Sequence, residues 1–329
     1  MSTPAPDLHL STGPHIRRGR NTADIMWLVN LSLAPALVWA VLVFGWPVLG
    51  ITLASVAGCA LAEHLFCKMR GTASTVLDGS VVCTGLLLAY TLPPGLPLWM
   101  PFVGGALGVF FSKSVFGGLG YNIFNVALVA RAIMMATFPV AMTTAWLTPG
   151  FGEVAGVDAL SGATPLVTLT GGREAAGAAL AGLPEGMNAT LAFFLGLRPG
   201  SVGEVSVLMI AAGAGFLLWQ GIIKLTIPLS VLAGALVMSP WSPDPVLYML
   251  SGGLWLGAFF MATDYVTSPS TFRGQVVFGL GIGLLTGMIR NWGGYPEGIC
   301  YAILLMNMLT PALDEWFRPP RTAPGGTPS

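Results

Sequence analysis

The sequence predicts an all-α, polytopic membrane protein with about ten transmembrane helices in two five-helix halves. Three observations predict this fold. Hydrophobic residues make up 54% of the 329 residues and charged residues 9%, whereas a soluble domain carries about 25% charged residues. Apolar runs long enough to cross a bilayer recur along the chain. Basic residues gather in alternate connections between these runs. Lipid is therefore the main solvent of the chain, and its formal net charge of zero leaves no footprint for nucleic acid.

The apolar runs follow one another in a regular order. The third and fourth are short, and Pro93-Pro94-Gly95 predicts a tight turn between them. The fourth, sixth, eighth and ninth are rich in glycine, which favours close contact between helices in lipid. The predicted spans are 25–44, 48–66, 77–92, 98–112, 123–143, 202–219, 222–239, 246–263, 275–290 and 297–313.

Five segments describe the expected organisation. No cleavable signal peptide is expected, because polar, proline-rich residues lead directly into a long apolar run. The segments are an N-terminal stretch 1–24, a first transmembrane half 25–143, a loop 144–201, a second transmembrane half 202–313 and a tail 314–329.

The basic residues orient this arrangement. An even number of spans places both termini on one side, and the other side then holds few basic residues, namely Arg173, Arg198 and Arg290. Cytoplasmic connections carry the excess of lysine and arginine in membrane proteins. We therefore expect a multi-pass protein of the bacterial inner membrane with cytoplasmic termini and a periplasmic loop 144–201. The basic residues on the terminal side are Arg17, Arg18, Arg20, Lys68, Arg70, Lys113, Lys224, Arg273, Arg318 and Arg321.

Residues 104–111 resemble residues 252–260, since both read as glycine-rich runs that end in Phe-Phe. Halves of five spans would lie upside-down relative to each other, yet both repeated segments precede loops on the same predicted side. Two interpretations stay open. The likeness reflects the general composition of membrane helices, or the second half is not a simple inverted copy of the first. Inverted halves often build a binding site near the bilayer midplane.

A small polar heptapeptide, Asp158-Ala-Leu-Ser161-Gly162-Ala163-Thr164, interrupts this apolar chain. Thr164 offers a hydroxyl nucleophile between small residues and Pro165, which restricts Thr164 to extended or turn conformations. An accessible side-chain oxygen on a loop is typical of a site of covalent modification.

The heptapeptide resembles the D-x-x-S/T-G-A-T signal of proteins that a dedicated transferase modifies with FMN. Residues 117–125 (GGLGYNIFN), 13–15 (GPH) and 290–298 (RNWGGYPEG) extend the resemblance over nearly the whole chain. They are similar to the RnfD/NqrB family, the membrane subunits of ion-translocating electron-transfer complexes. Val126 departs from the family pattern, which usually has proline after Asn125.

The resemblance implies a flavoprotein in which FMN is joined by a phosphoester to Thr164. Ser161, Gly162 and Ala163 would allow the phosphate to approach the backbone. Asp158 serves recognition by the transferase or caps a turn, and both readings stay open. The implied partners are other Rnf subunits that carry flavin and iron–sulfur centres, with the FMN transferase acting in maturation. A second, noncovalent flavin such as riboflavin is compatible with the family, but no residue here assigns it.

Charged side chains in or beside the spans are candidates for an ion path or for buried pairing: Glu63, Asp78, Arg131, Asp264 and Glu297. Glu63 and Asp264 lie near predicted span ends, where water could solvate them. Asp78 precedes the third span in an arrangement typical of a helix cap. Arg131 lies about two turns inside its span, and its partner could be an acid or a flavin phosphate or carbonyl. Structural pairing is favoured over transport.

Cysteine, histidine and tryptophan give weaker signals. The four cysteines lack metal-ligand or disulfide spacing and are expected to be buried small hydrophobes. The three histidines are isolated, so no metal site or catalytic residue is assigned. Several tryptophans near span ends predict aromatic belts at the membrane interfaces, namely Trp219, Trp241, Trp255, Trp292 and Trp316.

Three hypotheses for the function follow from these patterns. The preferred hypothesis is an electron-carrying membrane subunit of an Rnf-type complex, a translocase that couples electron flow between ferredoxin and NAD to Na⁺ or H⁺ movement. The alternatives are a solute channel or carrier with an incidental heptapeptide, and a passive assembly subunit without flavin. The heptapeptide favours the first hypothesis, and the glycine-rich spans alone would favour the carrier.

Overall fold

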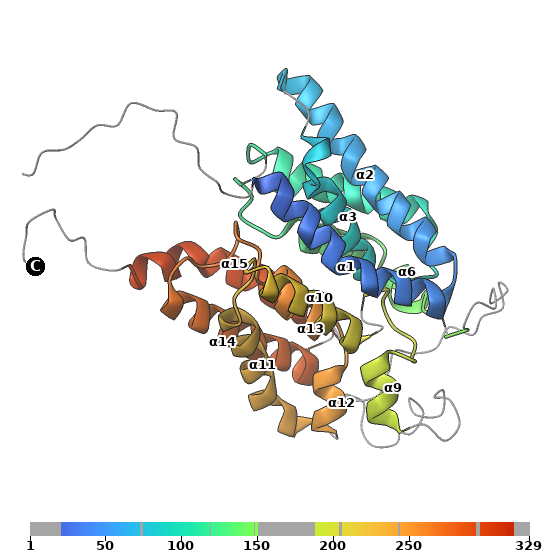
Figure 1. Ribbon diagram of the computed structural model, residues 1–329, viewed down its shortest axis with the longest axis vertical. Coiled ribbons are helices and arrows are strands. Elements are labelled where there is room, and N and C mark those ends of the chain that lie inside the picture. The colour runs from blue at the N-terminus through green and yellow to red at the C-terminus, as the bar shows by residue number, and fades with distance from the viewer. Residues whose placement is uncertain are drawn as a thin grey trace, which may run out of the picture.

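The computed structural model describes residues 21–72, 75–118, 120–147, 149–150, 188–203, 206–242, 244–293 and 297–318. Within these ranges the chain is helical and contains no strand (Figure 1). This confirms the predicted all-α class, and each predicted apolar run coincides with helical structure. The elements are α1 (Thr22–Phe44), α2 (Pro47–Arg70), η1 (Val76–Asp78), α3 (Ser80–Tyr90), α4 (Trp99–Val109), η2 (Phe110–Ser114), α5 (Val126–Thr137), α6 (Pro139–Thr144), α9 (Ala189–Leu195), α10 (Val207–Trp219), α11 (Thr226–Met238), η3 (Ser239–Trp241), α12 (Pro245–Leu250), α13 (Leu254–Leu256), η4 (Gly257–Met261), α14 (Phe272–Trp292) and α15 (Ile299–Trp316).

Among the described helices, α1, α2 and α14 are long and apolar enough to cross a membrane alone. Several others are shorter but still apolar, and consecutive pieces such as α5 and α6 together cover one predicted span. The segment 144–201, which was expected to be a loop, contains the short helix α9. That helix packs against α10 and α12. The loop is thus partly helical at its C-terminal end.

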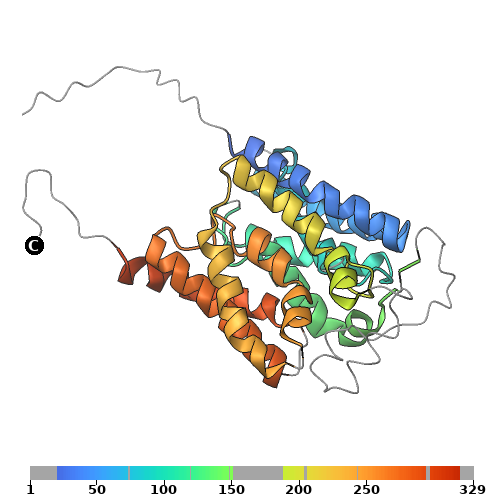
Figure 2. The ribbon, with the colours of Figure 1, turned by 60° about the horizontal axis from the view of Figure 1, so that its bottom comes forward.

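The described ends of the chain lie at one end of the helix bundle. Figures 1 and 2 show the start of α1 and the end of α15 on the same side. Helices α6 and α9, which flank residues 151–187, lie toward the opposite side. This agrees with an even number of crossings, and the side that holds the two described ends is called the terminal side below.

The two halves share one packing scheme. In the first half α2 packs along α4, and α4 packs against α5. In the second half α11 packs along α14, and α14 packs against α15. Each span of the first half therefore corresponds to the span five positions later. Because five is odd, the two halves run in opposite directions across the membrane.

The sequence likeness between 104–111 and 252–260 links the fourth span with the eighth, which do not correspond in this scheme. It is therefore a likeness of local composition and does not mark the inverted repeat. The two segments nevertheless share one local feature. Each ends in a π-helical turn, η2 in the first half and η4 in the second. Single π-turns within helices often occur at functional sites.

Glycine allows the closest helix contacts, as the glycine-rich spans predicted. A Cβ atom built on Gly58 of α2 would lie 2.0 Å from the Phe102 carbonyl oxygen of α4. A Cβ on Gly283 of α14 would lie 2.2 Å from the Val231 carbonyl oxygen of α11. These equivalent pairs, α2 with α4 and α11 with α14, thus approach backbone to backbone.

The third span of each half is interrupted. In the first half, Gly79 has φ +82° and separates η1 from α3. In the second half, Ser251, Gly252 and Gly253 separate α12 from α13. A continuous helix over 246–263 is therefore wrong, because Gly252 adopts φ +61°, which ends the helix there.

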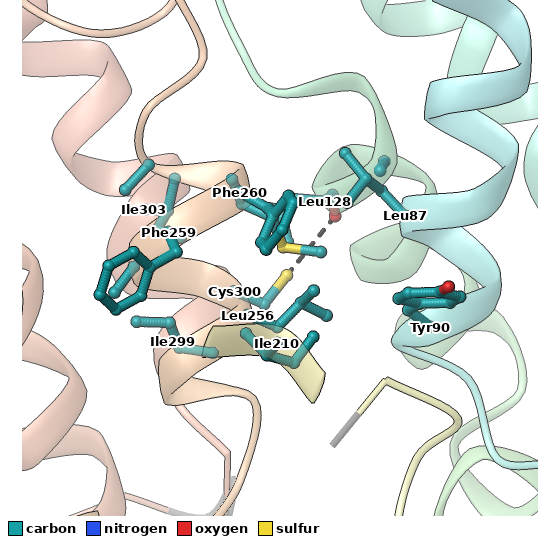
Figure 3. Packing of buried hydrophobic residues seen from close by; sticks show 14 of the residues in the cluster. Leu87, Tyr90, Leu128, Ile210, Leu256, Phe259, Phe260, Ile299, Cys300 and Ile303 are labelled. Atoms are coloured by element: carbon teal, nitrogen blue, oxygen red, sulfur yellow. Dashed lines mark hydrogen bonds between the residues drawn. The ribbon is translucent and has the colours of Figure 1, made fainter. Parts of the chain in front are cut away.

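Buried apolar side chains from both halves meet in one cluster (Figure 3). The four cysteines are buried and free, as the sequence predicted. Trp219, Trp241, Trp292 and Trp316 are exposed, and the rings of Trp241 and Trp292 lie 6.0 Å apart. These four fit the predicted interfacial belts, whereas Trp255 is half-buried and donates to the Met249 carbonyl.

Candidate functional site

The predicted flavinylation motif lies outside the described residues. Asp158, Ser161, Gly162, Ala163 and Thr164 all fall within 151–187. The described residues instead contain two internal cavities between the halves, and the predicted charged residues gather around them.

The larger cavity opens toward the terminal side and is called the Asn122 cavity. It holds about 830 Å³ of empty space including its mouth. Its polar lining comes from the start of α3, from η2, from the residues before α5 and from the residues after η4. These polar residues are Ser80, Thr84, Lys113, Asn122, Asn125, Thr263 and Asp264. Leu87, Phe259 and Phe260 contribute apolar walls.

Asn125 fixes one wall of this cavity. Its Oδ1 accepts hydrogen bonds from the backbone N–H groups of Ala127 and Leu128, at 3.1 and 3.3 Å, and so caps α5. Its Nδ2 donates to the Met261 carbonyl at the end of η4. Asn125 therefore ties the first half to the second at the cavity, and the cap is present although valine follows Asn125.

Lys113 and Ser80 contribute to a second wall, and Lys113 belongs to a buried ion pair. Lys113 Nζ lies 2.6 Å from Glu63 Oε2 and donates to Ser80 Oγ at 2.9 Å. Thr75 Oγ1 donates to the other Glu63 oxygen. Glu63 is 4% exposed and Lys113 is 3% exposed. Of the alternatives that the sequence left open for Glu63, the structure shows buried pairing and not solvation, because Lys113, fifty residues further along the chain, neutralises it.

The two aspartates near this cavity accept local hydrogen bonds. Asp78 accepts from the Ser80 backbone N–H at 2.8 Å at the start of α3, although the N-cap residue itself is Gly79. Asp264 is half-buried, lines the cavity and accepts from the Val266 N–H and the Thr267 hydroxyl. Within the described residues Asp264 forms no salt bridge. Among the described residues, the Asp264 carboxylate thus lacks the basic partner that Glu63 has in Lys113.

The smaller cavity lies deeper and is called the Arg131 cavity. Arg131 pairs with Glu297 and donates to the Thr91 carbonyl. Thr91, Arg131, Ser201 and Glu297 all line this cavity. Arg131 belongs to α5 of the first half, whereas Glu297 immediately precedes α15 of the second. The predicted pairing of Arg131 with an acid is therefore seen, and it joins the two halves.

Two further arginines hold the interrupted eighth span, and no role was predicted for them from the sequence. Arg290 donates to the carbonyls of Tyr248, Ser251 and Glu297 at 3.0–3.2 Å. Arg198 donates to the Leu250 carbonyl at 3.2 Å and lies over the Phe193 ring. The carbonyls at the end of α12 lack helical partners, which is costly inside a membrane. The Gly-Gly pair at 252–253 was the signal for this break.

Apolar side chains of the buried cluster lie between the polar residues of the two cavities, and Figure 3 shows how several of them pack. Leu87, Phe259 and Phe260 line the Asn122 cavity. Tyr90, Leu128, Leu256, Ile299 and Cys300 line the Arg131 cavity. Cys300 Sγ of α15 donates to the Leu128 carbonyl of α5, as the dashed line in Figure 3 shows. Cavities on either side of an apolar barrier, at the junction of the two halves, are typical of carriers and channels.

Comparison with known proteins decides the family. The profile of the NQR2, RnfD, RnfE family matches residues 9–323. The chain belongs to the NQR2, RnfD, RnfE family. Its relatives in this family include a protein of Clostridium ljungdahlii described as the D subunit of a proton-translocating ferredoxin:NAD(+) oxidoreductase complex. The two are 41% identical over 320 residues, which cover 94% of each chain.

Other members of the NQR2, RnfD, RnfE family carry similar descriptions. The D subunit of the Na(+)-translocating ferredoxin:NAD(+) oxidoreductase complex of Acetobacterium woodii is 40% identical, over 94% of this chain and 93% of its own. The D subunit of the ion-translocating oxidoreductase complex of Escherichia coli strain 536 is 37% identical, over 94% and 97%. The relatives described with protons and with sodium are about equally similar, so overall identity does not select the ion. Family membership and apolar helices together make the chain a multi-pass membrane protein.

Proposed function

We propose that the chain is the D-type membrane subunit of an Rnf-type complex, an ion-translocating ferredoxin:NAD oxidoreductase. The observation that carries this proposal is the match to such subunits over nearly the whole length of both chains. The subunit acts with the other subunits of the complex and not as an isolated enzyme, since ferredoxin, NAD and iron–sulfur sites belong to its partners in this scheme. The comparisons favour this function over the solute carrier that the cavities alone would also fit.

The proposed electron carrier is FMN, bound by a phosphoester to Thr164. The support is the heptapeptide Asp158-Ala-Leu-Ser161-Gly162-Ala163-Thr164 in a chain of this family. A flavin exchanges one or two electrons, so it can connect donors and acceptors of different electron number. Covalent attachment keeps it on the periplasmic loop of an inner-membrane protein whose termini are cytoplasmic.

The attachment site is tested by expressing the chain with an FMN transferase and recording in-gel flavin fluorescence after denaturation. Wild-type protein and Thr170→Val, a control six residues away in the same segment, are expected to fluoresce. Thr164→Val is expected to be dark, because it lacks the hydroxyl that forms the ester. Fluorescence of Thr164→Val equal to that of the control would refute the attachment at this residue.

A second, noncovalent flavin is proposed in the Asn122 cavity. A flavin ring is flat and apolar, with one edge that carries carbonyl and N–H groups. The cavity combines the Leu87, Phe259 and Phe260 walls with the amides of Asn122 and Asn125, so its residues fit such a ring. When bound, the flavin supplies the electron transfer, while the chain's residues bind its edge and exclude water from its faces.

This second site is tested on the purified complex by counting flavin released on denaturation. One noncovalent flavin is expected per complex in excess of the other subunits' flavins, and Phe260→Trp should displace it by filling the wall. Retention of all noncovalent flavin in that variant would contradict the assignment to this cavity.

Coupling to Na⁺ or H⁺ is proposed to use the path between the halves. Asp264 and Lys113 line the Asn122 cavity, with Glu63 paired to Lys113, whereas Arg131 and Glu297 line the Arg131 cavity. Apolar side chains stand between the two cavities. Ionisable side chains inside membrane bundles are costly and usually serve transport or pairing. Asp264, which forms no salt bridge within the described residues, is the candidate ion ligand of this group.

A further inference from the structure

The inverted halves place two basic residues at equivalent positions. Lys113 lies in η2, at the end of the fourth span, and Arg290 lies near the end of α14, the ninth span. Each reaches the interrupted third span of its own half. Lys113 donates to Ser80, the first residue after the break at Gly79. Arg290 donates to Tyr248 and Ser251 at the break after α12.

The two contacts differ in their acceptors. Arg290 bonds backbone carbonyls, so its contacts follow the fold itself, and it is not among the residues that line either cavity. Lys113 bonds a carboxylate and a hydroxyl, both of which are side-chain groups. Its side chain also lines the Asn122 cavity. A flexible lysine with mobile acceptors can change partner, whereas an arginine fork on fixed carbonyls is held in place.

The ammonium of Lys113 occupies a position surrounded by oxygens. Glu63 Oε2 lies 2.6 Å away and Ser80 Oγ lies 2.9 Å away, and Thr75 Oγ1 bonds the second Glu63 oxygen. Hard cations such as Na⁺ take oxygen ligands from carboxylates and hydroxyls. Without the ammonium, the same carboxylate would need another cation or a proton, because an unpaired buried charge is costly.

We propose that Glu63, with Ser80 and Thr75, forms a binding site for a monovalent cation that exchanges with the Lys113 ammonium when negative charge enters the Asn122 cavity. This inference rests on the second flavin proposed above. One electron added to that flavin gives the cavity one negative charge, and Lys113 turns from Glu63 toward it. One Na⁺ or H⁺ from the terminal side then neutralises Glu63. Charge balances at each step, since one electron and one cation enter together.

Reoxidation reverses the exchange. When the electron leaves, the ammonium returns to Glu63 and displaces the bound cation. Lys113 is thus a positioning residue that converts the charge of the cavity into occupancy of the Glu63 site. Within the described part of the chain, the other titratable side chains near Lys113 include Asp264 and Tyr265, which line the same cavity, and Asp78, which accepts from the Ser80 backbone. They also include the buried thiols of Cys59 and Cys83.

The test is the reduction potential of the noncovalent flavin in the purified complex. One arm varies Na⁺ at constant pH, and the other varies pH at constant Na⁺, so that the two ions are distinguished. In wild-type complex one arm is expected to raise the potential by up to about 59 mV for each tenfold increase in ion, the value for one ion per electron. Glu63→Gln and Lys113→Gln should bind the flavin but lose this dependence.

Two variants control for damage to the fold. Glu63→Asp keeps the carboxylate and is expected to keep the dependence. Lys68→Gln removes an exposed positive charge from the end of the same helix, α2, and should behave as wild type. A full ion dependence in Glu63→Gln with the flavin bound would overturn the exchange alone. A wild-type complex without any noncovalent flavin in this subunit would overturn the second-flavin proposal and the exchange together.

Discussion

Removing both partners of the Arg131–Glu297 pair should destabilise the protein by clearly less than the sum of the two single removals. The pair is buried between α5 and the start of α15, and Arg131 also donates to the Thr91 carbonyl. Breaking a buried ion pair costs about 3–5 kcal/mol, because the remaining charge stays buried without a partner. We therefore expect about 3–5 kcal/mol of lost unfolding free energy for Arg131→Met and for Glu297→Gln.

The double variant Arg131→Met/Glu297→Gln leaves no buried charge at this position. The unfolding free energy that the double variant loses should be about 2–3 kcal/mol smaller than the sum of the two single losses. This difference is at the upper end of the coupling energies measured for contacting residues. Tryptophan fluorescence during reversible unfolding in mixed detergent micelles measures all four proteins. Arg273→Met, which removes an exposed arginine, is the control and should change stability by about 0.5 kcal/mol or less. Additive single losses would refute the pairing across the halves.

Three further predictions follow from packing and orientation. Gly283→Leu should prevent the close contact of α14 with α11 and lower the yield of folded protein in size-exclusion chromatography. The control Gly215→Leu should keep the wild-type yield, because a Cβ at Gly215 meets nothing within 4 Å. Equal yields of the two variants would contradict the close approach of the helices. Arg290→Lys should lower the unfolding free energy by about 2–4 kcal/mol, because an ammonium cannot reach the Tyr248 and Ser251 carbonyls of the broken span and the Glu297 carbonyl together; a loss of unfolding free energy below about 0.5 kcal/mol would show that these three bonds are unnecessary. A membrane-impermeant maleimide should label Thr190→Cys in cells with an intact inner membrane but label Glu315→Cys only after permeabilisation. The native cysteines are buried and should give little background labelling. The reverse labelling pattern would contradict the proposed topology.

The spans were predictable because burial in lipid makes a long apolar run sufficient evidence of a helix. The breaks were less predictable, since Ser251-Gly252-Gly253 lies within a run that is apolar on both sides. The apolar character of that run does not reveal that α12 ends there and that Arg290, about forty residues later, bonds its carbonyls. The glycine pair was the local signal, and its meaning depended on a distant side chain.

The charged residues show the same limit. The sequence identified Glu63, Arg131 and Glu297 as unusual, but their partners are set by tertiary packing. Lys113 reaches Glu63 from 50 residues away. Arg131 and Glu297 come from different halves of the chain. A single sequence gives the cost of burying each charge but not the neighbour that offsets it, so buried pairing and solvation both stayed open for Glu63.

The central claim is that this membrane subunit carries a flavin nucleotide on Thr164. An intact-mass spectrum of the subunit released from its native complex tests it most directly, followed by mapping of the modified peptide. We predict the mass of the polypeptide plus one FMN less one water, with the increment on the peptide that contains Thr164. A spectrum with the bare polypeptide alone, from a complex that is active in electron transfer, would contradict the claim.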